Sequence, residues 1–131
     1  NELRGNSGNN QIEGKLGYDI MYGGGGADRF VYRSISDSGT DAEGGFTDEI
    51  KDFSSGAGDR IDLRLIDADP NLPGNQAFKM HTGAFDSAGQ VRFKLLSNAT
   101  AVELNTDSDE APEMVIRVVN GGAGSASWFL L

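Results

Sequence analysis

The sequence predicts an all-β domain, built as a short parallel β-roll that is continued by antiparallel, β-sandwich-like strands. Two observations support this fold. A glycine-rich nonapeptide repeat opens the chain, and a strand-like alternation of apolar and polar residues dominates the remainder. No long amphipathic helical pattern interrupts either part. With 131 residues, of which 37% are hydrophobic, the chain suits one structural domain with a modest core.

Residues 5–31 divide into three consecutive nonapeptides that start at Gly5, Gly14 and Gly23. Each has a second glycine three residues later, a carboxamide or carboxylate at its sixth place, and an apolar residue at its eighth. The sixth-place residues are Asn10, Asp19 and Asp28, and the eighth-place residues are Ile12, Met21 and Phe30, with Leu3 in the same register. A flexible glycine linker has no reason to space these residues equally, so the repeat indicates a regular structure.

The period of nine predicts how the repeats stack. About six residues form a turn and three form a short strand whose middle side chain points inward, so two repeats complete one coil. Turns two repeats apart then lie on the same edge. We expect the turn 5–10 to face the turn 23–28. The turn 14–19 should face a segment that begins at Tyr32 and carries Asp37 in the sixth-place register.

The composition of the turns is typical of a calcium cradle. Glycines permit positive φ angles and let carbonyl oxygens converge, while carboxylates supply hard, charged ligands. Asp48 or Asp52 can add a ligand from the following segment, and Asn10 lacks the charge of an aspartate, so we expect a weaker site there. The candidate ligands of Ca²⁺ are Gly5, Ser7, Asn10, Gly14, Leu16, Asp19, Gly23, Gly24, Gly26, Asp28, Asp37 and Asp48.

Composition also excludes several classes of function. The formal net charge is −9, and such a surface repels nucleic acids and anionic membranes but attracts divalent cations. The chain has no cysteine, so neither disulfides nor thiolate metal sites can stabilise it. One histidine, His81, and no visible nucleophile or acid–base arrangement argue against an independent enzyme. No apolar run approaches the length of a membrane span, and the first residues lack the order of a cleavable signal.

The second part of the chain predicts antiparallel strands. Apolar residues alternate over 61–65, 91–95 and 102–104, and residues 114–119 form an apolar run that Arg117 interrupts. Between β-like runs, Asn105, Asp107, Asp109 and Glu113 alternate like the oxygen ligands of a calcium loop, but Glu110 stands where a sharp turn needs glycine. We interpret this stretch as an acidic, solvated hairpin connection.

The repeat resembles the RTX nonapeptide family, written G-G-x-G-x-D-x-U-x with U apolar. Further segments resemble the C-terminal domain of serralysin-type (M10) peptidases, namely residues 27–32, 36–38, 48–53, 59–63 and 74–78. The resemblance covers nearly the whole chain and implies a calcium-binding β-roll with an antiparallel extension. We therefore expect residues 1–37 to form the roll and residues 38–131 to form a capping region, in one structural domain overall.

The resemblance also implies a function. Such domains are non-catalytic modules of secreted bacterial enzymes that fold on extracellular Ca²⁺ and support stability and type I secretion. The implied partners are calcium ions, the ABC transporter of the secretion system and the N-terminal catalytic domain of the same polypeptide. Residues 126–131 resemble the apolar tail of such substrates, although Trp128 stands where the family usually has an acidic residue. The parent enzyme stays open among protease, lipase, epimerase and glycanase.

A competing interpretation is a module that binds an acidic, alginate-like polysaccharide, because RTX modules also flank epimerases and other polysaccharide enzymes. Arg92 and Lys94 lie on one face of a predicted strand, and Arg117 can join them from another. Solvated strand charges explain these three residues equally well.

Overall fold

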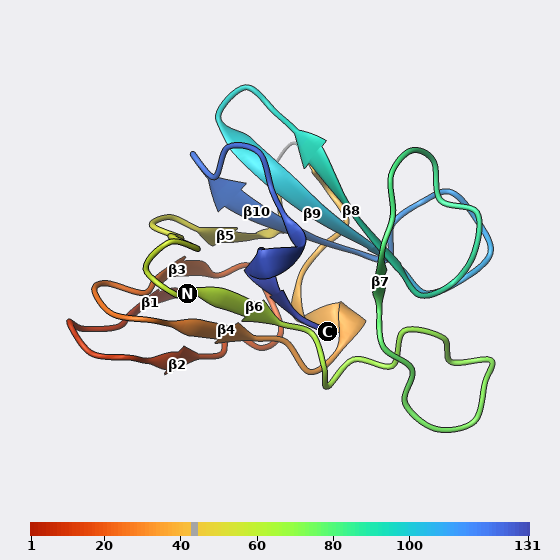
Figure 1. Cartoon of the computed structure of the whole chain (residues 1–131), viewed down its shortest axis with the longest axis horizontal. Helices are drawn as coiled ribbons and strands as arrows, with labels where there is room; N and C mark the ends of the chain where they lie inside the picture. Colours follow the sequence, from red (N-terminus) through yellow and green to blue (C-terminus); the bar gives the residue numbers. More distant parts are fainter. Residues whose placement is uncertain (43–44) are drawn as a thin grey trace.

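The structure is a computed structural model that describes residues 1–42 and 45–131 (Figure 1). These residues form two β-sheets and two single turns of 3₁₀-helix, which confirms the predicted all-β class. Sheet A has seven strands in the order β1-β3-β5-β10-β9-β8-β7, and sheet B has four in the order β11-β6-β4-β2. Among the helical turns of the described residues, none has the length and apolar character to span a bilayer.

The parallel roll consists of short strands that alternate between the two sheets (Figure 1). Its strands are β1 (Glu2–Arg4), β3 (Ile20–Tyr22) and β5 (Asp48–Ile50) in sheet A, and β2 (Gln11–Ile12), β4 (Arg29–Val31) and β6 (Arg60–Asp62) in sheet B. Leu3 lies opposite Met21, and Ile12 lies opposite Phe30. Stacked strands are therefore two nonapeptides apart, as the period of nine predicts.

The eighth place of each repeat builds the core of the roll. Ile12, Met21 and Phe30 are at most 6% exposed, and Leu3 packs against the same cluster. The next coil continues both rows, since Ile50 pairs with Met21 and Ile61 pairs with Phe30. The inward row therefore persists in the packing after the repeat has disappeared from the sequence.

The parallel stack continues past residue 37. After β4 the chain forms one 3₁₀ turn, η1 (Ile35–Asp37), in which Ser34 and Asp37 make a reciprocal capping box. The connections to β5 and β6 are longer than in a nonapeptide, yet both strands pair in parallel with the previous coil. Residues 48–62 thus add a further coil to the roll that was predicted for residues 1–37.

The antiparallel part is a meander of β8 (Gln90–Leu95), β9 (Ala99–Asn105) and β10 (Met114–Val119). β10 also pairs in parallel with β5, which joins the meander to the roll, and β7 (Lys79–Met80) pairs with β8 at the far edge. A tight turn joins β8 to β9, and in it Leu96 N donates to Ala99 O at 2.9 Å.

The end of the chain returns to sheet B. After η2 (Ala126–Trp128), β11 (Phe129–Leu130) pairs in parallel with β6 and places Phe129 opposite Ile61. The Trp128 ring packs against Phe53 and Phe93, with ring centroids 4.9 and 5.1 Å apart respectively. The tail thereby closes the core from one side.

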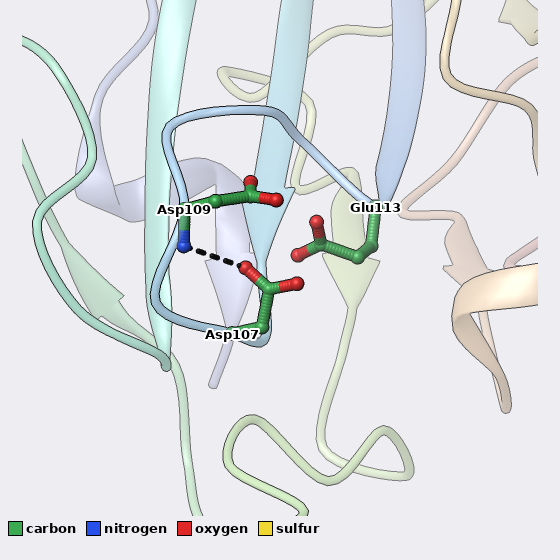
Figure 2. A group of neighbouring side chains, drawn as sticks. All are labelled: Asp107, Asp109 and Glu113. Carbon is green, nitrogen blue, oxygen red and sulfur yellow. Dashed lines mark hydrogen bonds between the residues drawn. The ribbon is translucent and has the colours of Figure 1, made fainter.

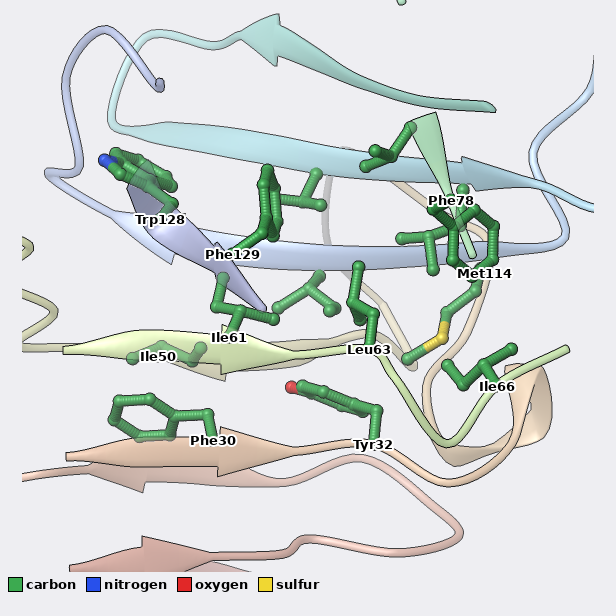
Figure 3. Close-up of a cluster of buried hydrophobic side chains, with 14 of the residues drawn as sticks. Phe30, Tyr32, Ile50, Ile61, Leu63, Ile66, Phe78, Met114, Trp128 and Phe129 are labelled. Carbon is green, nitrogen blue, oxygen red and sulfur yellow. The ribbon is translucent and has the colours of Figure 1, made fainter. Parts of the chain in front are cut away.

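One hydrophobic core joins the roll to the antiparallel part (Figure 3). It contains Phe30 and Ile61 from sheet B, Ile50 and Met114 from sheet A, and Trp128 from the tail, all at most 3% exposed. Because apolar side chains at this burial contribute about 1.5–3 kcal/mol each, neither part keeps its full stability without the other.

Tight stacking of the turns gives a first prediction. Gly24 has a φ of +92°, and a Cβ there would lie 2.3 Å from the carbonyl oxygen of Asn6 in the stacked turn. Gly24→Ala should therefore lower the free energy of unfolding in excess Ca²⁺ by about 2 kcal/mol or more, through backbone strain and displacement of the turn.

Gly56→Ala is the matched control, because a Cβ at Gly56 would have no heavy atom within 4 Å. This variant should change the free energy of unfolding by less than about 0.5 kcal/mol. Urea denaturation of both variants measures the difference, and equal stability of the two would contradict the close stacking of the turns 5–10 and 23–28.

Candidate metal centre

The sixth-place carboxylates form two ladders, one along each edge of the roll. In every step, a main-chain N–H at the sixth place donates to Oδ1 of the equivalent residue one coil further on. Asn10 N donates to Asp28 at 2.8 Å, and Asp28 N donates to Asp59 at 2.9 Å. On the other edge, Asp19 N donates to Asp48 at 2.9 Å. The backbone of one coil therefore fixes the carboxylates of the next.

The carboxylate folds back over the first glycine of its own repeat. A Cβ on Gly23 would lie 2.3 Å from Asp28 Oδ2, and a Cβ on Gly14 would lie 2.8 Å from Asp19 Oδ2. In the first repeat, a Cβ on Gly5 would lie within 2.3 Å of both Asn10 Oδ1 and the carbonyl oxygen of Gly23. Oxygens from two stacked turns converge there, in a cradle that any side chain would fill.

These buried carboxylates lack partners for part of their charge. Asp19, Asp28 and Asp48 are at most 1% exposed. The Oδ2 atom of each is buried without a hydrogen-bond partner in the described residues. An ionised carboxylate in this state costs several kcal/mol, and a hard cation with six to eight oxygen ligands removes that cost. The oxygen-only donor set of the turns therefore fits Ca²⁺.

The edge that carries Asp19 concentrates negative charge. Burial, together with the charges of Asp19 and Asp37, raises the pKa of Asp48 to about 7, although the hydrogen bond from Asp19 N opposes the shift. Burial and the charge of Asp48 also raise the pKa of the Tyr32 hydroxyl well above its usual range, so Tyr32 stays neutral. The N-terminal ammonium of Asn1 lies 2.9 Å from Asp19 Oδ1 and balances one of these charges. At neutral pH the remaining charge of this edge favours a proton or a bound cation.

The sixth-place register predicted for Asp37 is corrected by the structure. The strand that stacks on β3 is β5, so Asp48 takes this place. Residues 32–36 contain no glycine for a roll turn, and the chain forms η1 instead, where Asp37 Oδ2 accepts from Arg33 N at 2.8 Å and Ser34 N at 3.1 Å. Asp37 still lines an open hollow of about 680 Å³ with Gly14 and Leu16. Its role as a ligand stays a prediction.

The turns 5–10 and 23–28 are stacked as predicted. Gly25 N donates to Asn6 O at 2.9 Å, and a Cβ on Gly25 would lie 3.5 Å from Ser7 Cα. Gly26 has a φ of +94°, and a Cβ there would lie 2.8 Å from the main chain of Gly8. The predicted ligands of the first site thus lie together, while their coordination of an ion stays a prediction.

Two carboxylates of the third coil contact the stacked turns, although the sequence pattern gave them little or no part in the site. Asp59, absent from the predicted ligands, is 2% exposed and continues the ladder of Asp28; burial and the charges of Asp28 and Asp52 raise its pKa. Asp59 stands two residues before Ile61, as Asp28 stands two residues before Phe30, and this spacing is the sequence pattern that could have identified it. Asp52 caps the turn 23–28, because its two oxygens accept from Gly23 N at 2.8 Å and Gly24 N at 2.9 Å.

The basic patch predicted for a saccharide is not formed. Arg117 is 8% exposed and pairs with Glu49 at 2.9 Å. Arg92 pairs with Glu103 at 2.6 Å. Lys94 is exposed, but the other two charges are neutralised, so this face offers no cluster of free cations.

The parallel roll with its carboxylate ladders defines the class of RTX-type β-roll domains. Residues 3–130 match the family described as Peptidase M10 serralysin C terminal. The chain belongs to this family of accessory C-terminal domains of secreted bacterial enzymes.

A solved structure shows the same architecture. The AlgE6R3 subunit of the mannuronan C5-epimerase from Azotobacter vinelandii is similar over 98% of this chain, with 25% identity and a TM-score of 0.65, and the chain spans 66% of that subunit. The AlgE6R2 subunit of the same enzyme is 19% identical, with a TM-score of 0.44 over 100% of this chain and 92% of the subunit. The curated proteins contain no match.

Proposed function

We propose that this chain is a non-catalytic, calcium-binding module of a secreted bacterial enzyme, and that its roll folds when it meets extracellular Ca²⁺. The observation that carries this proposal is the set of buried carboxylates of Asp19, Asp28 and Asp48, whose Oδ2 atoms have no hydrogen-bond partner in the described residues. Those of Asp19 and Asp28 lie over the first glycine of their own turns. A bound cation satisfies several such oxygens at once and leaves the carboxylates ionised.

Folding and ion binding are one process in this proposal. Without ions, the clustered carboxylates repel each other, and 19 glycines carry a large ordering entropy. The sites exist only when the turns stack, so the free energy of binding is free energy of folding. Extracellular calcium sites have dissociation constants of about 10⁻⁴–10⁻³ M, so they fill outside the cell and stay empty in the calcium-poor cytosol.

The proposal assigns two ion positions to the roll. One lies between the turns 5–10 and 23–28, where oxygens of Gly23 and Asn10 converge above Gly5. The other lies at the turn 14–19, beside the buried carboxylates of Asp19 and Asp48. The first should bind more weakly, because Asn10 brings no charge.

Removal of calcium tests the proposal. Circular dichroism and amide NMR of the module should show an ordered roll in excess Ca²⁺ and loss of order at residues 5–31 in chelator. Asp19→Asn and Asp28→Asn should each raise the calcium concentration at the folding midpoint several-fold, because each removes one buried ligand charge.

Asp86→Asn is the matched control, since Asp86 is an exposed carboxylate outside the roll. It should leave the midpoint unchanged. A module that is equally well ordered in excess chelator, with no metal retained, would overturn the proposal.

We also infer that the type I secretion machinery reads the C-terminal tail before the module folds. In the folded chain, Trp128 and Phe129 are only 3% and 7% exposed, and β11 is paired with β6. A transporter can therefore contact these side chains only in the unfolded chain. The low calcium of the cytosol supplies that state.

Truncation of the tail tests this inference in the full-length parent. Deletion of residues 128–131 should reduce the amount of parent enzyme in the culture medium several-fold, because the transporter loses its apolar contact. Trp128→Phe keeps an aromatic ring and should preserve export. Immunoblots of medium and cells measure both variants, and unchanged export of the deletion variant removes the tail from the proposal.

A second candidate function, binding of an acidic polysaccharide, is supported by the likeness to AlgE6R3 and by the outer face of sheet B. Arg29 and Arg60 are paired neighbours on β4 and β6. Arg29 also lines a hollow of about 390 Å³ with Arg33 and Arg64. Arg29 and Arg64 pair with Asp62, and Arg33 pairs with Glu13, yet these guanidinium side chains stay 42–56% exposed, whereas that of Arg117 is 10% exposed. Exposed guanidinium groups can exchange such a partner for a ligand carboxylate in bidentate geometry, so this face suits a chain of uronic acids better than the predicted face around Arg117.

Titration with alginate oligomers, followed by amide NMR, tests this candidate. The double variant Arg33→Gln/Arg64→Gln removes two exposed charges that line the hollow and should weaken binding at least about fivefold, because each contributes a modest part of the affinity. Lys94→Gln, on the outer face of sheet A, is the control and should bind normally. Saturating oligomer without shifts in β4 and β6 would eliminate this surface.

A further inference from the structure

A separate cluster of oxygens lies outside the roll, in the connection between β9 and β10 (Figure 2). Asp107, Asp109 and Glu113 each offer one carboxylate oxygen, and these atoms lie within 4.8 Å of one another. Two oxygens that share one Ca²⁺ at about 2.4 Å are at most about 4.8 Å apart. The spacing is therefore that of ligands around a single ion.

The loop holds these carboxylates through its own main chain. Asp107 Oδ1 accepts from Asp109 N at 2.9 Å, and Asp109 Oδ1 accepts from Ala111 N at 2.8 Å. Glu113 Oε2 accepts from Thr106 N at 2.6 Å. Each carboxylate thus uses one oxygen to fix the loop and has a second oxygen available for a ligand. Figure 2 shows the three side chains converging from successive parts of the loop.

Asn105 provides an independent observation. It is 0% exposed, and its Oδ1 is buried without a hydrogen-bond partner in the described residues. Its Nδ2 donates to the carbonyl oxygens of Ser87 and Asp107, both at 2.9 Å, which fixes the amide and turns Oδ1 away from those carbonyls.

The strand register places Asn105 and Glu113 side by side. Met114 pairs with Leu104, so Glu113 and Asn105 are the next cross-strand neighbours and their side chains share one face of sheet A. A buried amide oxygen with no partner therefore lies on the side of the sheet that carries the Glu113 carboxylate. Leaving such an oxygen unsatisfied costs about 1–3 kcal/mol, which a bound cation recovers.

We propose that residues 105–113 bind one Ca²⁺ through side-chain oxygens of Asn105, Asp107, Asp109 and Glu113. The donors are all oxygens, which disfavours zinc and copper, and their irregular arrangement suits Ca²⁺ better than octahedral Mg²⁺. The ion would tie the β9–β10 hairpin to the segment at Ser87, which Asn105 already contacts. This site shares no residue with the roll, so it goes beyond the proposed function.

Calcium titration of the folded module, followed by calorimetry and amide NMR, tests the loop site. Asp109→Asn should remove one calcium equivalent or weaken it at least tenfold, and should abolish the shifts of residues 105–113. The asparagine can still accept from Ala111 N, so this variant keeps the loop geometry. Glu113→Gln should behave in the same way. Mg²⁺ at equal concentration should leave these amides unshifted.

Glu110→Gln is the matched control, because it removes the same charge from the same loop at an exposed position outside the cluster. It should bind calcium as the unaltered module does. Residues 5–31 report the roll separately, so failure there does not decide the loop. Absence of saturable shifts at 105–113, or equal weakening by Glu110→Gln and Asp109→Asn, would overturn the loop site.

Discussion

The hydrogen bond between a sixth-place N–H and the carboxylate one coil further on is the interaction on which this structure depends. It occurs on both edges of the roll, from Asn10 to Asp28 and from Asp19 to Asp48. It aligns the coils and at the same time holds the carboxylates where they are buried from solvent. The geometry that builds the roll therefore also creates an electrostatic cost, which a bound cation relieves in the proposed function.

The roll and the antiparallel meander stabilise the fold in different ways. The roll has short strands and a narrow inner row of apolar residues, and its edges carry buried charge. The meander β8–β10 supplies long strands and a wide apolar face that packs against Ile50 and Ile61 through the shared core. The meander thus contributes mainly apolar packing, whereas the edges of the roll carry the buried carboxylates.

Much of this was predictable from the sequence, because a period of nine determines strand, turn and inward residue together. The fold class, the two-repeat coil and the burial of Met21 and Phe30 follow directly from it. The predicted nine-residue spacing of the sixth-place residues is wrong after the last glycine-containing repeat. Asp37 keeps the numerical spacing, but without glycines the chain cannot make the roll turn, and Asp48 takes the sixth place after a longer connection.

Pairing across long sequence distances was not readable from local patterns. Arg117 looked like a surface charge on a strand, yet its partner Glu49 lies in the roll, and that pair became visible only with the parallel contact of β5 and β10. Asp59 was missed for a related reason. Its repeat has lost the glycine spacing, and only the stacking of β6 on β4 reveals its place.

The position of β11 has a consequence for chain integrity. β6 is paired on one side with β4 and on the other with the last strand of the chain, so any product that stops short of residue 129 presents an open sheet edge. The same product uncovers the rings of Phe53 and Phe93. A chain clipped before η2 and β11 thus exposes apolar surface and an unpaired strand, features that proteases and chaperones recognise, whereas β11 and Trp128 cover them when present.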